Sequence, residues 1–285
     1  MVVKKPPMAW WPMLAILLLL LVVLGLLGGI LLLASLTGNS LTTSGGRVAV
    51  VELKGQIGSK AVSLDGIVDL LDTAEQDSGV KAVVLDIDSG GGTPVATREI
   101  CERAKEVSNK KPVVAWIGET GTSGAYWIAT CANVTMADPL STIGSIGVIL
   151  QLPDVSELLD KLGITVNVIK KGDFKDIGNP FRNMTQEEKM ILEEIAEKLH
   201  AEFVAEISAN RKLSPEGVER LADGRIFLGK EAVELDLIDK TGTKKEAIQL
   251  AAKMAGIKPD WFYLRREVGF SELLSPPQTF WPFGG

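Results

Sequence analysis

The chain has 285 residues, of which 46% are hydrophobic, and this is enough for one sizeable core or two small ones. A net charge of −6 without a basic stripe argues against nucleic acid as a partner. The sequence holds no zinc-ligand spacing and no complete ATP-binding motif, so it predicts neither a metal site nor a cofactor.

The N-terminal part differs sharply from the rest, because no charged residue occurs between Lys5 and Arg47. Residues 13–36 form an apolar run of 24 residues, and a helix that crosses the bilayer core needs about 20. A cleaved signal peptide is the alternative, but its apolar core is only about 7–15 residues long and ends in a small-residue cleavage site. We therefore predict a transmembrane helix over residues 13–36, preceded by a short segment at residues 1–12.

The orientation of this helix follows from the charges beside it. Lys4 and Lys5 precede the apolar run, and no basic residue follows it before Arg47. The positive-inside rule then places residues 1–12 in the cytoplasm and the main domain outside, after a polar linker at residues 37–46. The outer part is acidic, so we expect that it does not lie flat on an anionic bilayer by charge attraction.

From Arg47 onward, strand-like and helix-like patterns alternate. Apolar, β-branched stretches predict strands at residues 48–53, 81–87, 112–117, 134–137, 148–152 and 165–169. Helical spacing and capping residues predict helices at residues 61–74, 93–107, 124–131, 155–162, 185–210, 215–221, 230–235 and 244–255. The alternation is typical of an α/β fold built of βαβ crossovers. We place this domain at residues 47–257 and expect a flexible tail at residues 258–285.

The longest predicted helix begins at a capping box formed by Thr185 and Glu188. Its apolar residues recur at helical spacing through Ile195, Leu199 and Phe203. This spacing predicts that one face of the helix is buried along its length.

The two cysteines, Cys101 and Cys131, lie far apart in the sequence, which fits neither a redox pair nor a metal cluster. They could form a disulfide in an oxidising compartment. Both fall in predicted helices among apolar neighbours, so we expect buried free thiols.

The glycine run Ser89-Gly90-Gly91-Gly92 stands directly after a predicted strand and before a predicted helix. Glycines let the backbone approach a ligand closely and point N–H groups at an anion. The anion could be a phosphate, although the lysine of a P-loop is missing, or the oxyanion of a carbonyl under attack. A simple tight turn is the third interpretation.

Ser123 lies in the stretch Gly121-Thr122-Ser123-Gly124-Ala125, between a predicted strand and a predicted helix. A serine at such a turn resembles a nucleophile elbow, although the last glycine of that motif is alanine here. The helix behind Ser123 would offer free N–H groups. The alternative is a serine that only caps the helix.

A nucleophilic serine needs a base, and the chain has one histidine, His200. It lies in the longest predicted helix among glutamates, so we expect a surface histidine. A lysine whose amine is kept neutral by burial is the other base that activates serine. Lys175 is the candidate, in a glycine-containing loop, and Ser145 on a glycine-flanked turn could hold its amine by a hydrogen bond. Solvated lysine and ordinary turn chemistry are the alternatives.

Together these pieces resemble the signal peptide peptidase A family in its short bacterial and archaeal form. The resemblance runs from about Val48 to Ala247 and rests on an ordered set of motifs: Ser89-Gly-Gly-Gly92, Thr122-Ser-Gly-Ala-Tyr126, Ile143-Gly-Ser-Ile-Gly-Val148, Leu159-Asp-Lys-Leu-Gly-Ile164, Lys171-Gly-Asp-Phe-Lys-Asp-Ile177 and Ala222-Asp-Gly-Arg225. Three positions depart from the family's usual residues: Gly90 replaces proline, Asp88 replaces asparagine and Ala125 replaces glycine.

The resemblance implies the Clp-protease/crotonase fold, a spiral of repeated β and α units, and a Ser-Lys dyad. Ser123 would be the nucleophile, Lys175 the general base and Ser145 the residue that positions it. The N–H groups of Gly91 and Gly124 would form the oxyanion hole. The family also implies a membrane-anchored, ATP-independent homo-oligomer that cleaves remnant signal peptides or other unfolded apolar peptides. The alternatives are a silent peptide-binding scaffold, a stomatin-type membrane peptidase and a crotonase-like acyl-CoA enzyme.

Overall fold

The computed structural model describes residues 46–60 and 62–265. The predicted transmembrane helix at residues 13–36, the linker before residue 46 and the end of the tail lie outside these residues. Among the helices of the described residues, none has the length and hydropathy that a bilayer crossing requires.

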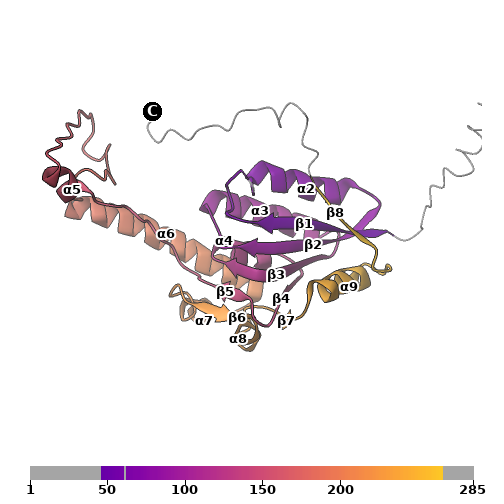
Figure 1. Cartoon of the computed structure of the whole chain (residues 1–285). Helices are drawn as coiled ribbons and strands as arrows, with labels where there is room; N and C mark the ends of the chain where they lie inside the picture. The colour runs from indigo at the N-terminus through magenta and orange to yellow at the C-terminus, as the bar shows by residue number, and fades with distance from the viewer. Residues whose placement is uncertain (1–45, 61, 266–285) are drawn as a thin grey trace, which may run out of the picture. The chain divides into compact units, whose positions relative to one another are not determined.

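The core of the domain is one eight-stranded sheet (Figure 1). Its central strands lie in the order β6-β5-β3-β2-β1-β8, and β4 pairs with both β3 and β7. All pairs are parallel except β5 with β6. The strands are β1 (Arg47–Lys54), β2 (Val80–Ser89), β3 (Val113–Thr122), β4 (Val134–Ala137), β5 (Thr142–Gly144), β6 (Ile226–Leu228), β7 (Lys240–Thr241) and β8 (Trp261–Tyr263).

Helices cover both faces of this sheet. On one face lie α2 (Leu64–Gln76), α3 (Pro94–Ser108) and α4 (Gly124–Thr130), and on the other lies α9 (Lys244–Met254). Successive residues of β2 point to opposite faces of the sheet: Leu85 packs toward α2 and α3, and Val84 packs toward α9. The predicted α/β fold with a buried parallel sheet is confirmed. The structure also extends past the predicted domain end, because β8 pairs with β1.

The C-terminal half holds α5 (Ser156–Lys161), α6 (Gln186–Arg211), α7 (Pro215–Glu219) and α8 (Gly229–Glu234). The predicted capping box of α6 is confirmed, with Thr185 Oγ1 accepting from the Glu188 N–H at 3.1 Å. The buried apolar residues of α6 all lie in its second half, as at Phe203, whereas Ile195 is 44% exposed, so the prediction of an apolar face buried along the whole helix is wrong. We call residues 149–195 the arm, and Figure 1 shows α5 and the start of α6 away from the sheet.

Two strand predictions in this region are wrong. Residues 148–152 and 165–169 have no regular secondary structure and pair with no strand in the described part of the chain. Their apolar side chains face outward, with Ile149 81% exposed and Ile169 100% exposed. The β-branched pattern was present, but a strand forms only where a partner satisfies its backbone groups.

The prediction of free thiols is also wrong, because Cys101 and Cys131 form a disulfide. Cys101 lies in α3, and Cys131 ends α4, with 5.5 Å between the two Cα atoms. Small residues such as Ala104 and Ala125 line the α3 and α4 surfaces in the buried core and let the two helices approach closely. The disulfide therefore joins the two helices that begin at the glycine run and at Ser123.

We predict that loss of this disulfide lowers the free energy of unfolding by about 2–4 kcal/mol, because the cross-link restricts the unfolded chain. Urea unfolding with and without a reductant measures the difference. The double variant Cys101→Ala/Cys131→Ala is the control, and its free energy of unfolding should be the same with and without the reductant. Two alkylated cysteines in the unfolded chain before any reduction would contradict the pairing.

Candidate active site

Ser123 occupies the turn between β3 and α4. Its backbone has φ 53° and ψ −128°, in the region that side-chain-bearing residues rarely adopt. Two hydrogen bonds hold this conformation: the Ser123 N–H donates to the Gly144 carbonyl at 2.8 Å, and its carbonyl accepts from the Trp127 N–H at 3.0 Å. The side chain is half-buried at the end of the strand, where a nucleophile elbow places its serine.

Ser145 lies at the end of the neighbouring strand. β5 runs parallel to β3 with Thr122 opposite Gly144, so the next residues of the two strands are Ser123 and Ser145. Neighbouring strands are about 4.8 Å apart. Ser145 also has a positive φ of 49°, and its N–H donates to the Arg225 carbonyl at 2.8 Å. The structure therefore brings the predicted nucleophile and the predicted positioning serine together.

The backbone of Gly91 lies against the Ser123 turn. A Cβ on Gly91 would stand 2.8 Å from the Ser123 Cβ and 2.9 Å from the Gly124 nitrogen, and its φ of 102° favours glycine. Only glycine fits between these atoms. The Gly91 N–H donates to Ser89 Oγ at 3.1 Å, so Ser89 engages one of the two N–H groups predicted for the oxyanion hole.

Gly124 is the first residue of α4, where an N–H has no partner inside the helix. A Cβ on Gly124 would stand 2.3 Å from Thr97 Oγ1, so α3 and α4 are in contact here. Thr97 is fully buried, and its hydroxyl has no hydrogen-bond partner among the described residues. Gly124 thus keeps a free donor beside Ser123, as the oxyanion-hole prediction requires.

Two hollows meet at Ser123. The first has a volume of about 310 Å³ and mainly apolar walls, which include Val95, Leu199 and Trp127 stacked on Phe203 at 4.9 Å between ring centroids. The second is wider, about 720 Å³, and is lined by the glycine run at residues 90–92. Sequence reasoning missed the apolar hollow, because α6 supplies one of its walls from far along the chain. The helical spacing of apolar residues in α6 was the one sequence signal that could have indicated this hollow.

Lys175 is not near Ser123 in this structure. It is exposed in the arm, lines neither hollow, and its side chain makes no hydrogen bond or ion pair with any described residue. Its loop is attached to the start of α6 at Glu188, whereas Ser123 lies beside Leu199. A rise of 1.5 Å per residue separates Glu188 and Leu199 by about 16 Å. One chain therefore does not bring Lys175 and Ser123 together.

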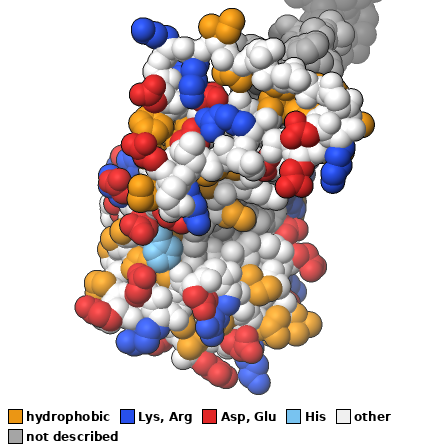
Figure 2. Space-filling view, turned by 90° about the vertical axis from the view of Figure 1, so that its left-hand side faces the viewer, with side chains coloured by type: hydrophobic (Ala, Val, Ile, Leu, Met, Phe, Trp, Pro, Cys, Tyr) orange, Lys and Arg blue, Asp and Glu red, His pale blue; other side chains and the backbone are white. Residues whose placement is uncertain are grey.

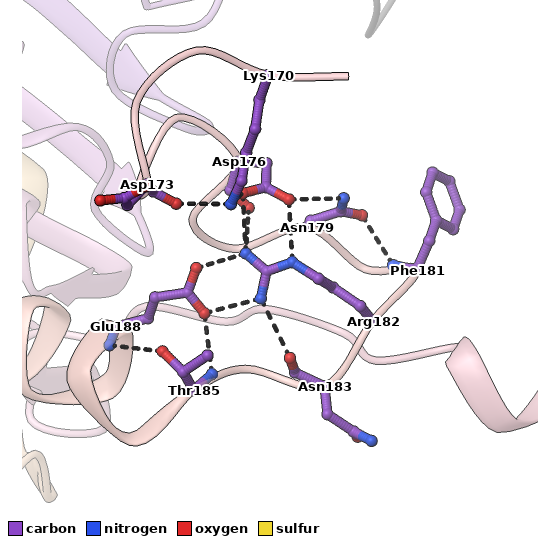
Figure 3. A network of polar contacts seen from close by, with 9 residues as sticks. All are labelled: Lys170, Asp173, Asp176, Asn179, Phe181, Arg182, Asn183, Thr185 and Glu188. Carbon is purple, nitrogen blue, oxygen red and sulfur yellow. Dashed lines mark hydrogen bonds and ion pairs between the residues drawn. The ribbon is translucent and has the colours of Figure 1, made fainter. Parts of the chain in front are cut away.

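A polar network centred on Arg182 holds the loop that carries Lys175 (Figure 3). The guanidinium donates to both carboxylate oxygens of Asp176 at 2.9 Å and to Glu188 at 2.9 Å, and Lys170 joins Asp176 from the other side. These hydrogen bonds from Arg182 lower the pKa of Glu188 to about 2 and hold the pKa of Asp176 well below its usual range. The loop is thus tied to the N-terminus of α6 by ionised groups.

His200 has an ordinary structural role. Its Nε2–H donates to the Ala222 carbonyl at 2.8 Å, and the side chain lines neither hollow at Ser123. Figure 2 shows this histidine, the pale blue side chain, at the surface among charged and apolar groups. A Ser-His-Asp triad is therefore not formed, as predicted from the position of His200 in the helix.

Serine at a strand-to-helix turn, beside glycine backbone and an apolar hollow, defines the class of the protein as a serine hydrolase. The sequence profile of peptidase family S49 matches residues 105–258. A relative named “Putative protease” in Methanocaldococcus jannaschii is 36% identical over 240 residues, 80% of this chain and 77% of the relative. One of the same name in Synechocystis is 38% identical over 219 residues, 77% of this chain and 78% of the relative.

A third relative, “Putative signal peptide peptidase SppA” of Enterococcus faecium, is 34% identical over 183 residues, 63% of this chain and 52% of the relative. The chain belongs to peptidase family S49, the signal peptide peptidase A family, and is a serine peptidase.

The contact at Gly91 predicts a sharp difference between two adjacent glycines. Gly91→Ala should lower kcat by about 100-fold or more, because the new methyl group displaces the Ser123 turn and the oxyanion donors. Gly90→Ala is the matched comparison: its Cβ would meet no protein atom within 4 Å and leaves the Ser123 turn in place, so kcat should fall far less than in Gly91→Ala. Steady-state peptide cleavage measures both, and equal activity in the two variants would contradict the contact.

The Arg182 network predicts a pH limit for the arm. A carboxyl whose pKa is lowered by folding adds stability above its unfolded pKa, and this stability is lost as the pH falls through the folded value. The ordered arm should therefore persist from pH 7 to about 4.5 and loosen between about 4.5 and 2. Carboxyl NMR titration should find one glutamate near pH 2. The pKa of this glutamate, Glu188, should return to the normal range in Arg182→Gln. It should stay low in Arg220→Gln, the control at an exposed arginine.

Proposed function

We propose that the chain is a membrane-anchored, ATP-independent serine endopeptidase of the Clp-protease/crotonase fold that uses a Ser123–Lys175 dyad. One observation carries this proposal: Ser123 is held in a left-handed turn beside Ser145 and the Gly91 backbone, at the mouth of an apolar hollow. Ser145 positions the lysine amine, and the N–H groups of Gly91 and Gly124 form the oxyanion hole once Ser89 releases the first of them.

The dyad forms between two copies of the chain. Within one chain Lys175 is separated from Ser123 by the length of α6 between Glu188 and Leu199, about 16 Å. A base has to lie within hydrogen-bond reach of the proton it accepts. The Arg182 network holds the Lys175 loop as one unit on the arm, and such a unit can reach the Ser123 turn of a neighbouring copy.

The surface of the arm supports a homo-oligomer. Soluble monomers rarely expose large continuous apolar patches, and such patches mark interaction sites. Many large apolar side chains of the arm are exposed, among them Ile149, Leu158, Leu162, Ile164, Ile169, Phe174 and Met190. Contact with a second copy would cover them and would also remove Lys175 from water, which a neutral lysine base requires.

The reaction is acyl transfer. The neutral amine of Lys175 accepts the Ser123 Oγ proton while Oγ bonds to the peptide carbonyl carbon, and the N–H donors hold the resulting oxyanion. The C–N bond then breaks, and Lys175 returns the proton to the leaving amine. A water molecule, deprotonated by Lys175, attacks the acyl ester, and Ser123 recovers its proton as the acid leaves.

The walls of the site favour an extended, apolar peptide. The hollow lined by Val95, Trp127, Leu199 and Phe203 fits an apolar side chain next to the scissile bond. The glycine-lined hollow leaves room for a peptide backbone. Remnant signal peptides and other unfolded apolar segments have this chemistry, and they lie in or near the membrane where residues 13–36 would anchor the enzyme.

The disulfide supports a location outside the cytoplasm. Disulfides persist mainly in oxidising compartments, and Cys101–Cys131 joins two core helices of the peptidase. The lysines before residue 13 favour the same orientation, with residues 1–12 in the cytoplasm and the domain outside.

Mixing of inactive variants tests the shared dyad. Ser123→Ala and Lys175→Ala should each lower kcat by at least about 10⁴-fold, since each removes one member of the dyad. After mixing and reassembly of the two variants, activity should return in part, because some sites combine an intact serine with an intact lysine. Cleavage of a fluorogenic peptide with a leucine before the scissile bond measures both effects.

Two controls make the result specific. Lys171→Ala removes a neighbouring exposed lysine of the same loop and should keep normal activity. A mixture of Ser123→Ala with the double variant Ser123→Ala/Lys175→Ala should stay inactive. Full activity of Lys175→Ala would refute the dyad, and no recovery in the first mixture would refute its sharing between copies.

A further inference from the structure

The parallel sheet has two different edges. The strands β1, β2 and β3 end on the side of the glycine run and Ser123, so their first residues share the opposite edge. The helices return to that opposite edge before each next strand begins. For α9 this is shown directly, because Lys244 at its start contacts Asp86 near the Ser123 side and its end leads into β8.

Basic side chains collect at the edge where the strands begin. Gly46 packs on the Lys81 side chain, the Arg47 N–H donates to the Gly79 carbonyl at 2.8 Å, and Lys111 Nζ donates to the Asp77 carbonyl at 2.7 Å. We call the following residues the basic edge: Arg47, Lys81, Lys110, Lys111, Lys253 and Lys258. In Figure 1 this edge lies at the right, where β1 begins.

Few carboxylates oppose these cations. Asp77 and Asp260 are exposed acids beside the basic edge in the described part, and two further acids of this region, Asp72 and Glu106, are paired with Arg103. Glu75 is half-buried and already paired with Arg103 and Lys110. The chain as a whole is acidic, so its negative charge is concentrated elsewhere. One such place is the hollow at the other edge, whose carboxylates are Asp86, Asp88, Glu119 and Asp138, opposed by Lys54 and Lys244.

The chain enters the domain at the basic edge. The apolar run ends at residue 36, and the nine residues 37–45 that lead to Gly46 span at most about 30 Å when fully extended. A linker of this length allows a bilayer that holds residues 13–36 to contact the basic edge. Trp261, which is 43% exposed, lies on the same side and has the amphipathic chemistry of an interface, and the apolar Met254 beside this edge is 40% exposed.

We propose that the basic edge lies against the anionic phosphate headgroups of the membrane that anchors the chain. The contact turns the opposite edge, with Ser123 and the glycine run, away from the lipid by about the length of β2, ten residues or roughly 33 Å. The net negative charge of the domain opposes this contact. At 0.1 M salt, however, charges interact only over about 10 Å, so the headgroups mainly interact with the nearby cations of the basic edge and little with the carboxylates at the opposite edge. This inference rests on the membrane anchor of the proposed function.

Amine labelling of the full chain in lipid nanodiscs tests the contact. One set of discs contains only phosphatidylcholine, and the other also contains about 30% phosphatidylglycerol, which adds negative surface charge. Mass spectrometry then reports the labelling of each lysine. In the anionic discs, labelling of Lys81, Lys253 and Lys258 should fall by about threefold or more and recover at about 0.5 M salt.

Lys60 and Lys230 are the internal controls, because both are exposed on the Ser123 side of the sheet and should be labelled equally in both discs. The variant Lys81→Glu/Lys258→Glu should lose the protection of Lys253. The matched variant Lys60→Glu/Lys230→Glu, with the same change of net charge, should keep it.

The outcomes separate the two levels of the proposal. A chain that enters the discs but shows equal labelling in both lipids overturns the basic-edge contact and leaves the anchor standing. Protection of the basic edge in both lipids assigns that surface to another contact and also overturns the inference. A chain that fails to enter any disc overturns the anchor itself.

Discussion

The contact between the Gly91 backbone and the Ser123–Gly124 turn is the constraint on which the site depends. It joins the ends of β2 and β3 more closely than any side chain at position 91 would allow. The two helices that start there, α3 and α4, are in contact at Thr97 and Gly124 and are cross-linked at Cys101 and Cys131. Ser123, the Gly91 and Gly124 backbone and the disulfide therefore belong to one unit built from two adjacent strand-to-helix turns.

Lys175, the base of the proposed dyad, lies on a separate part of the structure, the arm. The arm carries Lys175, and its loop is ordered by ion pairs around Arg182 more than by a core, since few arm residues are buried. Because ion pairs order this loop, the apolar side chains of the arm are not needed for its core and stay exposed. In the proposed function, the sheet would therefore provide the nucleophile and the substrate hollow, and the arm would provide the base and the surface that binds the next copy.

The sequence predicted those features that local patterns determine. The strands β1 to β4, the capping box at Thr185 and the turn serine at Ser123 follow from spacing and turn chemistry within a few residues. The short strands β5 to β8 were not predicted. Features that depend on distant partners were predicted less well: the two arm stretches lacked a strand to pair with, and the cysteines met only through α3–α4 packing. The separation of Lys175 from Ser123 was also not predicted, because the order of motifs in a sequence carries no information on the distance between them in space.

The backbone at Ser123 and Ser145 has a consequence for the history of the site. Both residues have φ near 50°, where a β-branched side chain is strongly disfavoured. Threonine carries the same hydroxyl group as serine, and its codons are one base change away from several serine codons. It is nevertheless unsuited to either position, because the added methyl group strains a turn that is already left-handed. Backbone geometry, and not the reactivity of the hydroxyl, therefore restricts which residues can occupy these two positions over evolutionary time.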